Sequence, residues 1–354
     1  LGVLGEVVLG SMLLGEAEEV VVPAMEAAFM ESREEWLNTL QSLPGGYVPE
    51  RDGTTMPEIA KATDAVLPAR SHILTPLAEL SNMFLLEGER GCHRTCTFCV
   101  MRRSTNGGMR LVTPDRVVGL VPEYAPKVGL VGAAISDHPQ LLEILERLVA
   151  KDKGLGISSL RADRVARKPR IAELLRAGGY RTLTVASDAA SQRLRRSISK
   201  GTVERHLMEC AQIAADNHYS VLKIYMMVGV PEETDDDIDE LVRFTRELAA
   251  IHKIALGIAP FVPKRNTPLD TALFAGISTV EKRLSRLRKG LSGVAEVRPT
   301  SARWAWVEAE LAQGGPEWGN AVVNAVAEGG RFSDYKREFK ALDPSQRGPW
   351  RTVA

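Results

Sequence analysis

The sequence predicts an α/β fold in which six parallel strands, each followed by helix, form a partial TIM-like (β/α)6 barrel. Six short apolar or β-branched runs occur in the 354-residue chain, at 82–87, 128–133, 155–160, 182–187, 221–228 and 254–262. Amphipathic helical patterns follow these runs, at 114–125, 139–150, 171–177, 203–215, 235–251 and 280–291. Strands that are apolar throughout and alternate with such helices are typical of parallel βα units buried on both faces. Six units are too few for a closed barrel, which favours an open one; a doubly wound sheet is the alternative.

The other segments divide the chain into four expected parts. Residues 1–50 hold an apolar run and a helical pattern at 21–43, and we expect them to be the tail of an α/β domain. Chain breakers and weak periodicity predict a linker at 51–80. The barrel then occupies 81–293, and 294–354 forms a small C-terminal extension. Because the chain begins with Leu inside an apolar run, we expect upstream sequence to be missing.

The composition is that of an ordinary globular protein. The chain has 45 Lys and Arg against 45 Asp and Glu, 44% hydrophobic residues and four Cys, which excludes a disordered, collagen-like or disulfide-stapled chain. A net charge of zero provides no chain-wide field for a nucleic acid or a membrane. The opening apolar stretch contains Glu6 and no preceding basic residue, unlike a secretory signal. We therefore expect a cytoplasmic protein with no membrane partner.

Three of the four cysteines, Cys92, Cys96 and Cys99, lie on one short loop directly after the first predicted strand. Active sites of parallel βα folds lie at the carboxyl ends of the strands. A structural zinc site needs four ligands, usually two Cys pairs, and no second pair exists, whereas three thiolates suit a [4Fe-4S] cluster with one open iron. Cys210 falls in a helical pattern and is expected to be a buried apolar residue. Four arginines near the loop are expected to lower the pKa of the thiols: Arg90, Arg94, Arg102 and Arg103.

The loop pattern Cys-x-x-x-Cys-x-x-Cys, with the aromatic Phe98 before the last cysteine, resembles the motif of the radical S-adenosylmethionine (SAM) superfamily. In that family the open iron chelates the amine and carboxylate of SAM, and reduction cleaves SAM to methionine and a 5'-deoxyadenosyl radical. The resemblance covers residues 82–291. It implies that the three cysteines are the catalytic cluster ligands and that Phe98 lies beside the cofactor. It also implies a flavodoxin- or ferredoxin-type electron donor.

The resemblance extends to the ends of the second and third strands. Gly132 stands where the family has its glycine-rich amine-binding strand, although the usual Gly-Gly-Glu is absent; tight helix–sheet packing is an equal alternative. Ser159 and Arg161 are polar residues at the end of an apolar strand, which favours a site over a core position. Arg161 is expected to pair with the methionyl carboxylate or with Asp163.

Three later residues complete the predicted cofactor site. Asp188 takes the place of the Glu in the family's Glu-Gly-Ser-x-x-Leu-Arg stretch, which faces the ribose. Lys223 lies inside an apolar run and, if buried, needs a partner, either a cofactor carboxylate or Asp188. Val262, after the last strand, is expected to lie beside the adenine.

The end of the barrel is similar to the methylthiotransferase and cobalamin-binding branches of the superfamily. Residues 15–19 and 43–49 more weakly resemble the tail of a cobalamin-binding domain, so cobalamin is a candidate cofactor, but the cobalt-ligating Asp-x-His-x-x-Gly motif is absent. We predict modification, including methylation, of an unactivated carbon of an unidentified substrate. Methylthiotransferase-like modification of tRNA or protein and a non-catalytic iron-sulfur or zinc module are the alternatives. RNA is the less favoured partner, although 161–205 carries 12 basic against 4 acidic residues.

Overall fold

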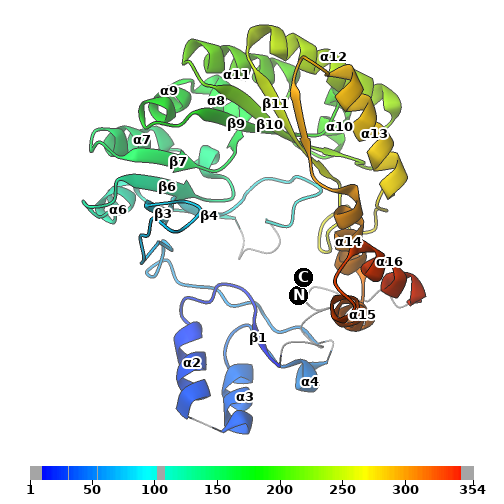
Figure 1. Ribbon diagram of the computed structural model, residues 1–354. Helices are drawn as coiled ribbons and strands as arrows, with labels where there is room; N and C mark the ends of the chain where they lie inside the picture. The colour runs from blue at the N-terminus through cyan, green and yellow to red at the C-terminus, as the bar shows by residue number, and fades with distance from the viewer. Residues whose placement is uncertain (1–9, 31, 54, 102–107, 344–354) are drawn as a thin grey trace.

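Two parallel sheets form an arc in the computed structural model, which describes residues 10–30, 32–53, 55–101 and 108–343 (Figure 1). The first sheet has the strand order β3-β6-β7, with β3 at Met83–Glu87, β6 at Lys127–Val131 and β7 at Gly154–Ile157. The second has the order β12-β11-β10-β9-β8. Its strands are β8 (Leu160–Arg161), β9 (Thr182–Asp188), β10 (Val221–Val228), β11 (Ile254–Pro260) and β12 (Glu296–Pro299). No closed barrel forms among these residues, and the predicted partial barrel is confirmed.

Helices cover the convex side of the arc, while the concave side faces the cysteine loop (Figure 1). Those after the first three strands are α6 (Pro114–Gly119), α7 (Leu141–Val149), α8 (Ala162–Arg167) and α9 (Arg170–Ala177). Those after the later strands are α10 (Gln192–Ser197), α11 (Glu204–Asp216), α12 (Asp235–Ile251) and α13 (Ile277–Gly290). The acidic start of α12 is a capping box in which Asp237 accepts a hydrogen bond from the Thr234 backbone at 2.8 Å. Helix capping thus accounts for Asp237.

The third expected strand, 155–160, is in fact two strands that belong to different sheets. β7 pairs with β6, whereas β8 pairs with β9. Ser158 and Ser159 lie between them and are exposed. The arc therefore changes sheets at this point. A further difference is β12, which extends the second sheet by pairing with β11 inside the predicted C-terminal extension.

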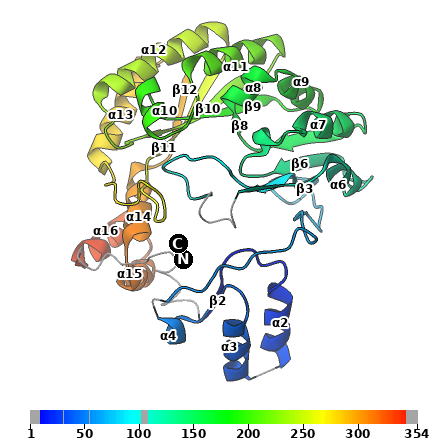
Figure 2. The ribbon, with the colours of Figure 1, turned by 180° about the vertical axis from the view of Figure 1, so that it is seen from behind.

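The N-terminal residues form a separate unit below the barrel (Figures 1 and 2). In it β1 (Met12–Leu13) pairs antiparallel with β2 (Gly46–Tyr47), beside α2 (Val21–Met30), α3 (Arg33–Ser42) and α4 (Pro49–Asp52). The helical pattern at 21–43 is thus two helices. Ser32 caps α3 and Glu35 returns the capping bond at 3.0 Å.

Three helices follow the barrel: α14 (Ala302–Gln313), α15 (Pro316–Ala327) and α16 (Phe332–Ala341). Trp306 on α14 packs edge-on against Phe332, with ring centroids 5.8 Å apart. Trp304, on the same helix, packs edge-on against Tyr335 with ring centroids 5.5 Å apart, so both tryptophans contact α16. In the part of the chain that the structure describes, no helix is long and apolar enough to cross a membrane.

Candidate functional site

The cysteine loop joins the two strands of an antiparallel hairpin. β4 (Glu89–Gly91) runs into the loop, and β5 (Met109–Leu111) leaves it, with Arg90 directly opposite Arg110. Gly91 has a φ of +92°, a left-handed conformation that glycine adopts without strain, and Cys92 follows it. The loop that follows β4 lies on the concave side of the arc (Figure 1). Arg94 in this loop binds Asp137, which follows the carboxyl end of β6.

The thiols of Cys92, Cys96 and Cys99 are half-buried and form no disulfide. Burial is the largest cause that raises the pKa of Cys92 and of Cys96, and the charge of Cys99 raises both further. Cys99 therefore interacts electrostatically with each of the other two thiols. Within the described ranges, no three His, Cys, Asp or Glu side chains are arranged to hold one metal ion. Thiolate sulfur is the donor type of iron-sulfur clusters, so the donor set fits such a cluster chemically.

The expectation that nearby arginines lower the pKa of the thiols is wrong for Cys92 and Cys96. At Cys96, burial outweighs the charges of Lys200 and Arg161. At Cys92, burial outweighs the hydrogen bond from the Arg94 backbone N–H. Moreover, Arg90 and Arg94 donate their hydrogen bonds to carboxylates, which neutralise much of their charge. Arg102 and Arg103 lie outside the described residues.

The middle of the loop is anchored to the turn after α10. The backbone N–H of Thr97 donates to the Ile198 carbonyl at 3.1 Å. The Cys96 thiol lies 3.7 Å from the Ser199 carbonyl oxygen. These contacts tie the loop to the second sheet.

Asp137, which follows β6, ties the start of the loop to the first sheet. Its side chain is completely buried and accepts hydrogen bonds from Arg94 at 2.7 and 2.8 Å and from Arg164 at 2.5 Å. Arg161 adds an ion pair at 3.7 Å. Burial alone would raise the pKa of Asp137, but the hydrogen bonds from Arg94 and Arg164 outweigh it and lower the pKa to about 2. Asp137 is therefore ionised at all physiological pH values.

Glu89 is a buried carboxyl group that sequence reasoning missed. Its side chain lies against Gly132, where an added Cβ would be only 2.3 Å from a carboxylate oxygen of Glu89. One oxygen accepts the Ala134 N–H at 2.6 Å, and the other has no hydrogen-bond partner among the described residues. Burial raises the pKa of Glu89 to about 7. A polar group in this state is a candidate for contact with a cationic ligand. No periodic signal marks it, since Glu89 sits among glycines and charged residues.

Asp188 pairs with Lys200, and not with Lys223, for which it was one of two expected partners. Asp188 has a φ of +63°, a strained conformation that aspartate tolerates better than most residues and that often marks functional sites. Lys223 is only partly buried, and its ammonium donates to the hydroxyl of Tyr225 at 3.0 Å. A cofactor carboxylate, the other expected partner of Lys223, stays a prediction.

The structure brings only some of the predicted residues together. The charges of Arg161 and Asp188 act on the Cys96 thiol, and Arg161 pairs with Asp163 at 3.0 Å. Phe98 packs against the main core. Gly132 lies against Glu89. Three further predicted residues form no hydrogen bond or ion pair with the loop among the residues described: Ser159, Lys223 and Val262. Cys210 is fully buried and its thiol lies 3.5 Å from the Ala162 carbonyl oxygen, which confirms its prediction as a core residue.

Comparison with known proteins identifies the domain that carries this site. The model of the radical SAM superfamily matches residues 88–245. An uncharacterised protein of Methanocaldococcus jannaschii is 32% identical over 214 residues, which cover 59% of this chain and 46% of that protein. The ribosomal protein uS12 methylthiotransferase RimO of Anaeromyxobacter sp. is 27% identical over 210 residues, which cover 53% of this chain and 42% of RimO. The chain spans less than half the length of either relative.

Two solved structures are also similar. SuiB of Streptococcus suis, bound to SAM, shares 12% identity at a TM-score of 0.47, over 64% of this chain and 52% of that one. OxsB, a cobalamin-dependent SAM radical enzyme with aqua-cobalamin and SAM bound, shares 14% sequence identity at a TM-score of 0.49. The match covers 79% of this chain and 41% of OxsB. The chain contains a radical SAM domain, on the match of the family model. Such a domain implies a [4Fe-4S] cluster and SAM.

Proposed function

We propose that this chain acts as a radical SAM enzyme in which Cys92, Cys96 and Cys99 hold a [4Fe-4S] cluster and leave one iron open to SAM. The observation that carries the proposal is the cysteine hairpin, whose loop presents three thiols that form no disulfide, inside the matched domain. When bound, the cluster and SAM supply one-electron cleavage to methionine and a 5'-deoxyadenosyl radical. A flavodoxin- or ferredoxin-type protein is the proposed electron donor.

Glu89 is proposed to accept the ammonium group of SAM. The superfamily's Gly-Gly-Glu is absent from this chain, but the unpaired oxygen of Glu89 places a carboxyl group beside Gly132, at the end of β6. A cation there would favour the ionised carboxylate, which burial alone disfavours. The remaining cofactor-binding assignments are kept as proposals: Phe98, Gly132, Ser159, Arg161, Asp188, Lys223 and Val262.

The proposed reaction modifies an unactivated carbon of a substrate, with methylation as one form. A methylthiotransferase-like reaction is the second candidate, and the RimO relative at 27% identity favours it. Cobalamin is proposed only from the resemblance of the N-terminal segment, which supplies no cobalt-ligating motif. Product mass discriminates the two reactions, because methylation and methylthiolation add groups of different mass.

Anaerobic reconstitution tests the proposal. We expect about four iron atoms per chain and release of 5'-deoxyadenosine when SAM and a reductant are added. Cys99→Ala should abolish both, whereas Cys210→Ala is the matched control, because Cys210 is buried in the core away from the loop. A protein that binds zinc, or a cluster that never cleaves SAM, would contradict the proposal and favour a non-catalytic metal module.

A further inference from the structure

Two like charges face each other at the base of the cysteine loop. Arg90 on β4 and Arg110 on β5 are direct cross-strand partners. Their side chains are only 12% and 16% exposed, so water screens them poorly. Like charges directly opposite each other destabilise an antiparallel pair. The hairpin that carries the cysteines therefore requires carboxylates in order to close.

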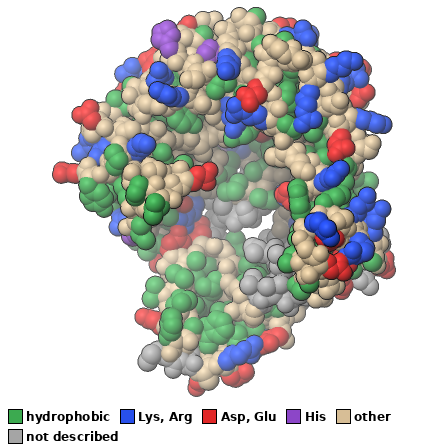
Figure 3. Space-filling view, in the orientation of Figure 1, with side chains coloured by type: hydrophobic (Ala, Val, Ile, Leu, Met, Phe, Trp, Pro, Cys, Tyr) green, Lys and Arg blue, Asp and Glu red, His purple; other side chains and the backbone are tan. Residues whose placement is uncertain are grey.

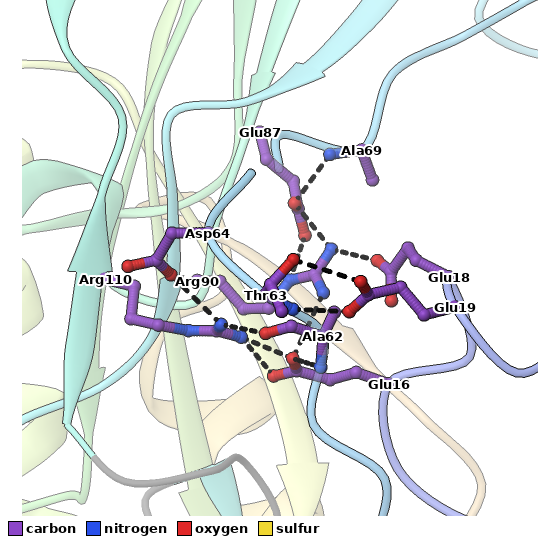
Figure 4. Close-up of polar contacts among 10 residues, drawn as sticks. All are labelled: Glu16, Glu18, Glu19, Ala62, Thr63, Asp64, Ala69, Glu87, Arg90 and Arg110. Atoms are coloured by element: carbon purple, nitrogen blue, oxygen red, sulfur yellow. Dashed lines mark hydrogen bonds and ion pairs between the residues drawn. The ribbon is translucent and has the colours of Figure 1, made fainter. Parts of the chain in front are cut away.

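Two of the four carboxylates that pair with these arginines, Glu16 and Glu18, come from the N-terminal unit (Figure 4). Glu16 binds Arg110 through both of its carboxylate oxygens and lies 3.6 Å from a guanidinium nitrogen of Arg90. Arg90 is also held by Glu18 at 2.5 Å and by Glu87, at the end of β3, at 2.8 Å. Glu16 is thus a carboxylate that contacts both facing arginines.

Glu16 is itself held in place by the segment that leads to the barrel. Its backbone N–H donates to the Ala60 carbonyl at 2.9 Å, and its carboxylate accepts the Ala62 N–H at 2.9 Å. Gly15, with a φ of +105°, brings the chain so close that an added Cβ would be 2.4 Å from the Ala60 oxygen. Arg110 donates to the Ala62 carbonyl at 2.8 Å. The backbone therefore fixes the carboxylate, unlike that of a mobile surface ion pair.

The two arginines depend on Glu16 to different degrees. Without its charge, Arg90 would keep Glu18 and Glu87. Arg110 would keep the Ala62 carbonyl and Asp64, whose side chain is 81% exposed and is screened by water. Loss of the Glu16 charge should therefore release β5, the strand that leads out of the cysteine loop.

We propose that Glu16 is a positioning residue that closes the cysteine hairpin, so that the N-terminal unit is a working part of the cluster site. This inference rests on the proposed function, because it assumes that the loop holds the cluster. The contact between the N-terminal unit and the barrel then holds the cysteine loop in place, in addition to joining two parts of the chain.

Hydrogen–deuterium exchange of the iron-free protein tests the inference without the cluster. Glu16→Gln keeps the shape of the side chain and removes its charge. We expect amide exchange in β4, β5 and the loop at 92–101 to rise about tenfold. Glu19→Gln is the matched control, because Glu19 bonds to Thr63 and, among the described residues, to no arginine. Equal exchange in Glu16→Gln and the unmodified protein, or an equal rise in the control, would overturn the inference.

A charge rescue separates positioning from a general loss of stability. After reconstitution, Glu16→Gln should lose iron to a chelator about tenfold faster than the unmodified protein and alter the cluster's EPR signal. Adding Arg110→Gln removes the like-charge pair and should restore slow iron loss. A double variant no better than Glu16→Gln would contradict the inference. If the unmodified protein binds no iron, the proposed function fails, whereas the exchange experiment still decides the role of Glu16.

Discussion

At the scale of single residues, three carboxyl groups around the cysteine loop have different surroundings. Asp137 meets three arginines, Asp188 meets Lys200, and Glu89 meets no cation among the described residues. The first is therefore ionised, whereas Glu89 holds its proton up to a pH of about 7. A cationic ligand at the strand ends would find an acceptor in Glu89, because Asp137 is already saturated with donors.

Glu89→Gln is expected to remove a pH-dependent loss of stability. Burial raises the pKa of Glu89 from 4.5 to about 7, so the folded protein binds more protons than the unfolded chain between these values. Stability should therefore fall as pH rises through this window and level off above it. Relative to Glu89→Gln, the loss of folding free energy is on the order of 3 kcal/mol. Urea unfolding of the iron-free proteins at several pH values measures it, and parallel pH profiles would contradict the prediction.

The same carboxyl group yields a binding prediction for the reconstituted protein. If Glu89 accepts the ammonium of SAM, Glu89→Gln should weaken SAM binding by roughly tenfold, since a hydrogen bond to a charged group contributes about 1.5–3 kcal/mol. Iron content should be unchanged, because Glu89 is not a proposed cluster ligand. Equilibrium binding of SAM to the oxidised protein checks this without turnover. Unchanged affinity with full iron content would assign Glu89 to packing alone.

At the scale of elements, the sequence predicts the six βα units well because each strand and helix is encoded by its own periodicity. The predictions that differ from the structure concern contacts between residues far apart in the sequence. The run at 155–160 is divided because its two halves pair with different neighbours, β6 and β9, which no local pattern records. Likewise, the partner of Asp188 could not be read from the chain, since Lys200 reaches it only after α10 has turned back. The cysteine motif, by contrast, is visible in the sequence because its spacing is local.

Asp137 links the loop to β6, and its removal should loosen this element. Asp137→Asn would leave Arg94 and Arg164 without their buried carboxylate. Breaking a buried ion pair on one side typically costs about 3–5 kcal/mol. We expect a lower melting temperature together with faster proteolysis within the cysteine loop. Asp115→Asn is the control, because Asp115 pairs with Arg147 at an exposed site. Equal effects of both substitutions would show that Asp137 does not secure the loop.

At the scale of the whole molecule, the described residues hold three separate apolar cores. One lies under the barrel helices, one among the C-terminal helices, and one in the N-terminal unit. Figure 3 shows that the space enclosed by these parts is hollowed, so they do not merge into one core. Contacts such as those of Glu16 then decide whether a disturbance in one part reaches the cysteine loop.

This arrangement predicts a selective effect of core damage on the loop. Leu37→Ala removes a fully buried side chain from the N-terminal core and should cost about 2–5 kcal/mol locally. Because Glu16 connects that unit to β5, amide exchange should also rise in the cysteine hairpin, but not in β10. Phe339→Ala damages the C-terminal core instead and should leave exchange in the hairpin unchanged. Equal amide exchange in the hairpin for both variants would show that the N-terminal unit does not stabilise the cysteine loop more than the C-terminal helices do.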